Sequence, residues 1–161
     1  MRPDWDDYFL GIATAVATRA DCTRRQVGAV IVKDHRIVSC GYNGAPPGQP
    51  GCLSGACPRG KLSYEEIAPM SSYDTGAGSC ISVHAEQNAI IYGDYARMVE
   101  GTIYITDNPC DGCMKMILGA RISRIVTPSL MISASSLRVG GNPGIGGAGG
   151  DLTGRSVRNH P

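Results

Sequence analysis

The first apolar pattern in the chain has the spacing of a helix. The positions that recur at this spacing are Tyr8, Phe9, Ile12, Ala15, Val16 and Arg19. This stripe predicts an amphipathic helix that runs to about Ala20. Asp4 or Asp6 can cap the N-terminus of the helix, because a carboxylate accepts hydrogen bonds from the free backbone N–H groups there.

A run of β-branched residues follows the first helix. Residues 27–32 (VGAVIV) are almost continuously apolar, which is typical of a strand that is buried on both faces. The polar residues 33–36 predict a turn, and residues 37–41 predict the returning strand of a hairpin.

Helical and extended patterns alternate in the second half of the chain. The predicted elements are a helix from His84 to about Gly93, a strand over 102–106, a helix from Cys110 or Asp111 to about Gly119, and a strand over 124–127. A strand, a helix and a strand in this order predict a right-handed unit with parallel strands. The complete order predicts an α/β protein with a mixed sheet and helices on both faces.

Two regions lack such periodic patterns. Residues 42–83 are rich in Gly, Pro and Ser, and a loop of this length in a compact domain needs a function or an internal staple. From Gly140 the composition changes to glycine-rich, and such a segment cannot bury enough apolar surface to become ordered. We therefore expect one domain over residues 1–139 and a flexible tail over residues 140–161.

Composition narrows the class of protein. The 161 residues suit one domain with a hydrophobic core, and 42% of them are hydrophobic. The formal net charge of +1 does not indicate a nucleic-acid surface. No apolar run reaches the roughly 18 residues of a membrane span. The polar N-terminus has no signal-peptide pattern, which predicts a cytoplasmic protein. In the reducing cytoplasm the seven cysteines are more readily metal ligands than disulfide partners.

Two short motifs carry the candidate chemistry. His84 and Glu86 form an H-x-E motif, and Pro109, Cys110 and Cys113 form a P-C-x-x-C motif. One imidazole and two thiolates leave the fourth position of a zinc ion open, as in catalytic zinc sites. Glu86 need not bind the metal and can act as a proton shuttle. The pair of motifs is the signature of zinc-dependent nucleobase deaminases.

The C-x-x-C motif and Glu86 each have an alternative interpretation. A lone C-x-x-C also fits a redox motif, a structural zinc or buried thiols, and Glu86 could be a solvated helix residue. The order of the two motifs, with Pro109 before the cysteines, argues against chance. The apolar neighbours of Glu86 indicate that the carboxylate has a specific role.

Three separate segments resemble one known family. Residues 84–90 (HAEQNAI), 23–30 (TRRQVGAV) and 41–46 (GYNGAP) resemble the deoxycytidylate deaminase family, and the resemblance runs from about Trp5 to Val126. It implies the three-layer α/β/α cytidine deaminase-like fold and the hydrolysis of dCMP to dUMP and ammonia. In the implied mechanism water attacks C4 of the pyrimidine, and Glu86 moves protons to N3 and to the leaving amine.

The resemblance also implies a set of substrate contacts. Asn43 is expected on the sugar side of the substrate, although Asn-Gly is also a strong turn signal. Arg24 and Arg25 are candidates for the 5′-phosphate, with at most one of the pair functional. The remaining candidates are Ala85, Asp107 and Asn108. The last two stand where family members have a His and an apolar residue, so they can alter which base is accepted.

Four further cysteines flank loops. Cys22, Cys52, Cys57 and Cys80 can close a tetrahedral structural zinc site, and some members of the resembled family carry a second zinc here. The alternative is four unrelated reduced thiols. Cys40 lies in a predicted strand and is interpreted as a small core residue.

The chain departs from the family pattern in two further places. Residues 59–78 are longer than expected and predict a lid, a specificity loop or a mobile segment. The family's fifth strand and last helix are not evident after Pro128. The resemblance places a nucleoside triphosphate regulator, dCTP or dTTP, at the Arg pair and residues 41–44. Because the fifth strand and last helix are not evident, the sequence does not decide whether the chain keeps this regulation or forms a homo-oligomer.

The leading hypothesis is therefore a zinc-dependent deaminase of a cytosine mononucleotide, most simply dCMP. The same chemistry on a modified cytosine nucleotide, a free nucleoside or a purine base is the first alternative. A zinc-stabilised module that only binds nucleotides is the second, and Glu86 argues against it because binding needs no proton shuttle. A nucleic-acid editor needs stacking aromatics in a basic groove, yet the chain has one Trp and one Phe.

Overall fold

The computed structural model describes residues 1–76, 78–133 and 136. The predicted glycine-rich tail lies outside the described residues. The elements follow one another as α1 (Trp5–Ala17), β1 (Gly28–Lys33), β2 (Arg36–Tyr42), α2 (Pro58–Lys61), α3 (Ala85–Ile91), α4 (Tyr95–Met98), β3 (Thr102–Ile105), α5 (Asp111–Gly119), β4 (Arg124–Val126) and β5 (Met131–Ser133). The three predicted helices, the hairpin and the later strands are thus confirmed to within a few residues.

The sheet has five strands in the order β2-β1-β3-β4-β5. Strand β3 runs parallel to β4, with Ile103 opposite Ile125. The other neighbours pair antiparallel. The prediction of a mixed sheet is confirmed, and so is the parallel strand–helix–strand unit.

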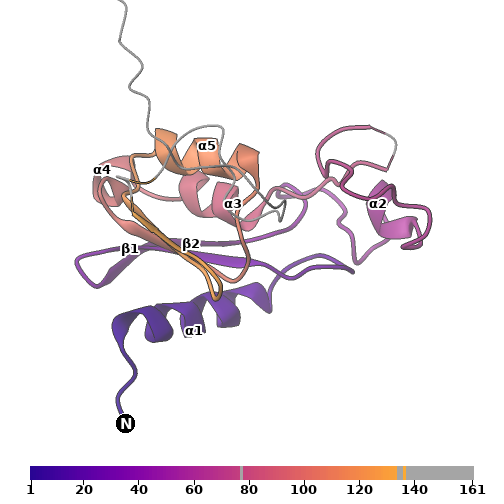
Figure 1. The fold of residues 1–161 in the computed structure, drawn as a ribbon. Coiled ribbons are helices and arrows are strands. Elements are labelled where there is room, and N and C mark those ends of the chain that lie inside the picture. The colour runs from indigo at the N-terminus through magenta and orange to yellow at the C-terminus, as the bar shows by residue number, and fades with distance from the viewer. Residues whose placement is uncertain (77, 134–135, 137–161) are drawn as a thin grey trace, which may run out of the picture.

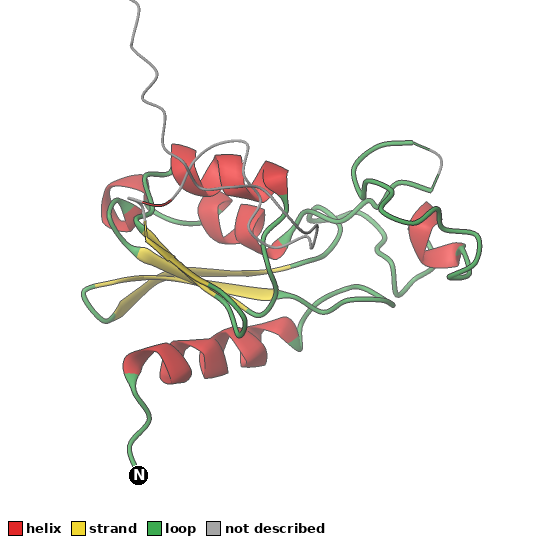
Figure 2. Cartoon of the chain, viewed as in Figure 1, coloured by secondary structure: helices red, strands yellow, loops and turns green. Residues whose placement is uncertain are grey.

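Helices cover both faces of the sheet (Figures 1 and 2). Helix α1 lies on one face, and α3, α4 and α5 lie on the other. Each face has its own apolar cluster. The cluster under α1 contains Phe9, Ala13, Val30, Val32, Tyr104 and Val126. The larger cluster under α3 and α5 includes Ile31, Ala89, Ile103, Ile105, Ile117 and Ile125. Burial of β1 on both faces agrees with its apolar run.

Helix α1 begins at its predicted cap. The Asp4 Oδ1 atom accepts a hydrogen bond from the Asp7 backbone N–H at 2.8 Å. The helix ends at Ala17, somewhat before the predicted end. It lies so close to the sheet that a β-carbon at Gly28 would overlap the Ala13 carbonyl oxygen. Among the described residues no helix is long and apolar enough to cross a membrane.

Helix α3 packs equally closely on strand β2. A β-carbon at Gly41 would overlap the Ala85 carbonyl oxygen, and Ser39 Oγ donates a hydrogen bond to the Ala89 carbonyl at 2.6 Å. Because side chains alternate along a strand, Cys40 points to the opposite face. The interpretation of Cys40 as a core residue is wrong, since it is exposed on this edge strand.

Some short elements differ from the sequence prediction. Strand β5 exists and pairs antiparallel with β4, although no fifth strand was evident after Pro128. Only Ile132 of its three residues is buried, so the alternation is too short to be recognised without its partner strand. Helices α2 and α4 have four residues each. Helix α2 lies in the long loop, which extends away from the end of the sheet (Figure 1).

Candidate active site

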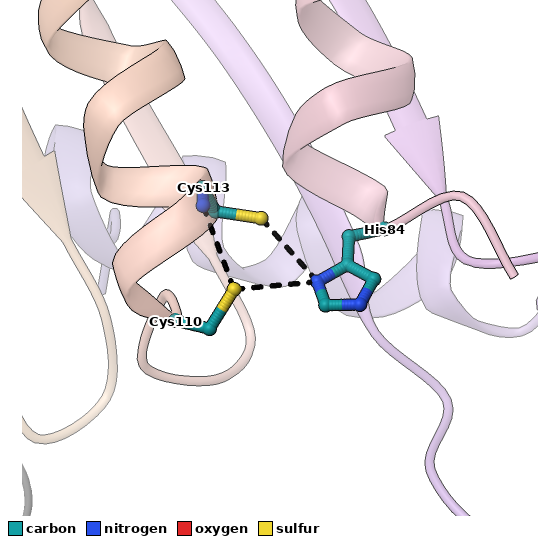
Figure 3. Close-up of side chains that lie close together, drawn as sticks. All are labelled: His84, Cys110 and Cys113. Atoms are coloured by element: carbon teal, nitrogen blue, oxygen red, sulfur yellow. Dashed lines mark hydrogen bonds between the residues drawn. The ribbon is translucent and has the colours of Figure 1, made fainter. Parts of the chain in front are cut away.

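His84, Cys110 and Cys113, called the His–Cys–Cys cluster below, meet between the starts of α3 and α5 (Figure 3). The His84 Nδ1 atom lies 3.6 Å from Cys110 Sγ and 3.3 Å from Cys113 Sγ. All three ligand atoms lie within 4.8 Å of one another. Within the described ranges this is the one group of three His, Cys, Asp or Glu side chains that meets this limit. The donor set is that of a zinc site with an open fourth position.

Local helix-start geometry explains this convergence. His84 is the N-cap of α3, and its backbone N–H donates to Gln87 Oε1 at 2.9 Å. Cys110 is the N-cap of α5, and its sulfur accepts from the Cys113 backbone N–H at 3.5 Å. Two cysteines three positions apart in a first helical turn share one face. Both sulfurs therefore point toward the imidazole.

The cluster is electrostatically polarised. Hydrogen bonds from Cys113 and His84 lower the pKa of the Cys110 thiol to about 3. The Cys110 thiolate, together with burial, raises the pKa of Cys113. The same thiolate raises the pKa of His84 against the effect of burial. The three groups are therefore electrostatically coupled, and the Cys110 sulfur is the position that most favours a negative charge.

Glu86 is a buried carboxyl in the first turn of α3. Only 4% of the residue is exposed. Burial raises the pKa of this carboxyl, against the opposing effects of its backbone N–H and of His84. A carboxyl group whose pKa lies closer to neutrality exchanges protons more effectively in general acid–base catalysis. The interpretation of Glu86 as a surface helix residue is therefore wrong.

One pocket opens onto His84, Glu86 and Cys110. It is also lined by every predicted substrate contact, namely Arg24, Arg25, Asn43, Ala85, Asp107 and Asn108. Lining residues that the sequence reasoning missed are Val27, Tyr73 and Ser82. Tyr73 belongs to the inserted segment 59–78, whose unusual length was its only sequence signal. Its place beside His84 depends on tertiary contacts.

Asn43 orders the wall of this pocket. Its Oδ1 atom accepts from the Val27 backbone N–H at 2.7 Å, and its Nδ2 donates to the Arg25 carbonyl at 2.9 Å. The adjacent Gly44 forms a β-bridge with Val83, which ties this loop to the approach to His84. Asn43 still has a second amide hydrogen, because each of its polar atoms uses one hydrogen bond here.

The two arginines have different partners. Arg24 Nε donates to the Arg59 carbonyl at 3.2 Å, a second nitrogen donates to the Leu62 carbonyl, and the guanidinium lies 4.8 Å from the centre of the Tyr64 ring. Arg25 forms an ion pair with Asp107, and 55% of its side chain is exposed. Arg24 thus holds the inserted segment, whereas Arg25 remains accessible from the pocket.

Asn108 connects the pocket to the turn before β5. Its Oδ1 atom accepts from Thr127 Oγ1 at 2.8 Å and from Ser129 Oγ at 3.2 Å. Asp107 forms the ion pair with Arg25, and its Oδ1 atom also accepts a hydrogen bond from the Asn108 backbone N–H at 2.8 Å. Both residues that depart from the family pattern therefore have structural partners as well as a place in the pocket wall.

The four remaining loop cysteines lie in neighbouring segments. Cys57 Sγ lies 3.8 Å from Cys80 Sγ, and Cys52 and Cys57 are both buried. Thr23 donates its backbone N–H to Cys52 Sγ at 3.5 Å. Cys22 Sγ accepts hydrogen bonds from the backbone N–H groups of Arg24 and Arg25. These four sulfurs are less compact than the His–Cys–Cys cluster, but they come from the three loop segments expected to converge.

Comparison with known proteins supplies independent information. Residues 3–129 match the family model described as the cytidine and deoxycytidylate deaminase zinc-binding region. The chain is 50% identical over 127 residues to the deoxycytidylate deaminase of Mycobacterium phage D29, covering 79% of this chain and 96% of that protein. It is also 35% identical over 148 residues to the deoxycytidylate deaminase of Saccharomyces cerevisiae. This match covers 90% of this chain and 44% of the yeast protein.

A solved structure agrees with these sequence matches. The dCMP deaminase of the cyanophage S-TIM5, in complex with dCMP and dUMP, superposes with a TM-score of 0.58. The match is 26% identical and covers 79% of this chain and 82% of that chain. The three-layer fold and the zinc-binding donor set agree with both comparisons. The chain therefore belongs to the cytidine and deoxycytidylate deaminase family.

Proposed function

We propose that this protein is a zinc-dependent hydrolase that deaminates dCMP to dUMP and ammonia. The observation that carries the proposal is the meeting of the His–Cys–Cys cluster with the buried carboxyl of Glu86 at one pocket. The phage D29 relative, which is named deoxycytidylate deaminase, supports the choice of substrate. So does the cyanophage enzyme, whose structure contains dCMP and dUMP.

The donor set fits a catalytic zinc ion. His84 Nδ1 and the sulfurs of Cys110 and Cys113 would hold it. Bound zinc lowers the pKa of a coordinated water toward ~7 and so supplies a nucleophile at neutral pH. Proximity to a cation would also keep both cysteines as thiolates.

Glu86 is proposed to carry the protons. Its carboxylate would accept a proton from the attacking water and deliver it to N3 of the pyrimidine. It would then take the remaining proton from the new C4 hydroxyl and pass it to the amine, so that the C4 carbonyl forms, the C–N bond breaks to release ammonia, and the carboxylate is regenerated. Burial supports this role, because it raises the pKa of the carboxyl and so favours its acting as an acid as well as a base.

The substrate would bind across the pocket wall. Asn43 has a spare amide hydrogen for a sugar oxygen. Ala85 is fully buried in the pocket lining, and its small side chain would leave room for the base. Arg25 is the better candidate for the 5′-phosphate, since the Arg24 guanidinium is engaged by backbone carbonyls. Phosphate binding would require Arg25 to exchange or share its pairing with Asp107.

We also propose a second, structural zinc at the four loop cysteines. The 3.8 Å approach of Cys57 to Cys80 and the burial of Cys52 and Cys57 support it. Four thiolates complete a closed tetrahedral site, which would staple the long loop that borders the pocket. A dCTP or dTTP regulator and a homo-oligomer stay predictions from the family resemblance.

A substrate panel tests the proposed reaction. Ammonia release should be measured for dCMP, CMP, deoxycytidine, a 5-substituted dCMP, cytosine and adenine with the zinc-loaded protein. The proposal expects the highest kcat/KM for dCMP. A higher value for deoxycytidine or for a purine would reject the mononucleotide substrate while keeping the deaminase chemistry. Nucleotide binding without ammonia from any compound would favour the non-catalytic module.

A further inference from the structure

The inserted segment 59–78 is anchored by a buried arginine. Arg59 is only 7% exposed. Its Nη1 atom donates to the Ser72 carbonyl at 2.9 Å, and its Nη2 atom donates to Ser71 Oγ at 3.0 Å. The guanidinium carbon also lies 4.2 Å from the centre of the Tyr73 ring. Removing the partners of a buried charge is strongly unfavourable, so these contacts fix the backbone of residues 71–73.

A second contact holds the same turn from the other side. The Cys80 backbone N–H donates to the Tyr73 carbonyl at 2.6 Å. Tyr73 then meets the imidazole of His84 edge-on, with ring centroids 6.4 Å apart. The position of residue 74, which follows directly, is therefore determined by Arg59 and by the segment that leads to His84.

The consequence is a carboxylate behind the candidate metal ligand. Asp74 Oδ1 lies 3.6 Å from His84 Nε2, whereas His84 Nδ1 faces the two cysteine sulfurs. The two ring nitrogens thus face partners of different chemistry. A separation of 3.6 Å exceeds hydrogen-bond length, and catalytic contacts are often long before the functional complex forms.

We propose that Asp74 is a positioning residue for the metal-binding histidine. Its carboxylate would accept a hydrogen bond from the Nε2–H group, which keeps the proton on Nε2 and leaves the lone pair of Nδ1 free for zinc. Such carboxylate–histidine–metal arrangements fix the tautomer and ring orientation of the ligand and raise its basicity. This inference rests on the proposed zinc site. It gives the inserted segment a function, because the segment supplies a group that acts on the metal through His84.

Zinc affinity tests the proposal directly. The variants are Asp74→Ala and Asp74→Asn, and the matched control is Glu65→Gln, which removes a fully exposed carboxylate from the same segment. Chelator competition would give the zinc dissociation constant of each protein, with Cys110→Ala identifying the ion at the His–Cys–Cys cluster. Asp74→Ala should weaken zinc binding there about 10- to 100-fold. Asp74→Asn should weaken it less, and Glu65→Gln should match the unaltered protein.

Two further measurements separate positioning from a general structural role. Thermal unfolding of the metal-free Asp74→Ala protein should match that of the metal-free unaltered protein. With zinc bound, the nitrogen NMR spectrum of His84 should show an Nε2 proton that exchanges slowly with water, and Asp74→Ala should accelerate this exchange. A lower melting temperature with unchanged zinc affinity would mean a structural role and overturn the proposal.

The remaining outcomes are also distinct. Complete loss of the ion in Asp74→Ala would make Asp74 a direct ligand and overturn the positioning role. Unchanged zinc affinity and proton exchange would overturn it as well, yet dCMP deamination by the same preparation would leave the proposed function intact. If the unaltered protein binds no zinc at the His–Cys–Cys cluster, the proposed function itself fails.

Discussion

The Nδ1 atom of His84 lies 3.3 Å from the Sγ atom of Cys113, although 29 residues separate the two along the chain. Helices α3 and α5 pack side by side on one face of the sheet, and both begin at the same end of it (Figure 3). Each ligand occupies a cap or a first turn, where backbone N–H groups have no partner within the helix. The positive helix ends therefore favour the thiolates that a metal needs.

Removing one of these sulfurs should remove the catalytic ion. We expect Cys110→Ala to lose about one equivalent of zinc together with deaminase activity, because two remaining ligands hold zinc poorly. Cys40→Ala is the matched control, since Cys40 is exposed and outside the pocket, and it should keep both. Elemental analysis and an ammonia assay measure the two quantities. An active Cys110→Ala protein with unchanged zinc would exclude this ligand assignment.

A second zinc should appear in the stoichiometry and in stability. Fully metallated protein should contain close to two zinc ions per chain. Cys57 is 1% exposed beside Cys80, so Cys57→Ser should lose one ion and lower the melting temperature before it changes turnover. Metal analysis combined with thermal unfolding tests this. One zinc per chain in carefully metallated protein would contradict the second site.

Arg25 should matter only for substrates that carry a phosphate. Loss of one charge-assisted contact is expected to reduce transition-state stabilisation by about 1.5–3 kcal/mol, or roughly ten- to a hundred-fold in kcat/KM. Arg25→Ala should show this loss with dCMP and little change with deoxycytidine. Arg24→Ala is the comparison variant, and it should affect both substrates alike because Arg24 holds the inserted segment. Equal losses on both substrates for Arg25→Ala would argue against phosphate recognition.

The ion pair between Asp6 and Arg124 should make the free energy of unfolding depend on pH in the acidic range. Arg124 donates to both carboxylate oxygens, at 2.7 and 2.6 Å, and lowers the pKa of Asp6. A group whose pKa is lower in the folded state stabilises the fold above its unfolded pKa of about 3.9, and this contribution disappears as pH falls through the folded value. Asp6→Asn should therefore lower the free energy of unfolding at pH 7 on the order of 1–2 kcal/mol.

Urea unfolding at several pH values measures this difference between the two proteins. The difference should be constant from pH 7 to about pH 5 and should shrink below about pH 4. Zinc release in acid affects both proteins, so it cancels to a first approximation because the two sites are independent. A difference that grows as the pH falls would show that the sign of the Asp6 contribution is wrong.

The sequence was most informative where the signal is local. The β-branched run of β1, the cap at Asp4 and the ligand spacing of Cys110 and Cys113 each depend on neighbours along the chain. The three-residue strand β5 was missed because pairing with β4 provides its stability. Exposure of Cys40 depends on what covers an edge strand, which no local pattern reports.

The inserted segment shows the same limit within the site. Nothing in the pattern of residues 59–78 indicated that Arg59 is buried or that Tyr73 lines the pocket. Both facts follow from contacts between segments of the long loop, whose geometry is set by the sheet and by the approach to His84. Likewise, adjacent Arg24 and Arg25 could be separated into a holding and an accessible residue only through their partners.

The most direct test of the account is the turnover of dCMP by the unaltered protein and by Glu86→Gln, with the zinc content of both measured in the same samples. The unaltered protein should form dUMP and ammonia in equal amounts. Glu86→Gln should retain the zinc of the His–Cys–Cys cluster and lose at least ~10²-fold in kcat, the scale expected for an acid–base group. Full activity in Glu86→Gln, or loss of its zinc, would contradict the assignment of Glu86 as the proton shuttle beside a three-ligand metal site.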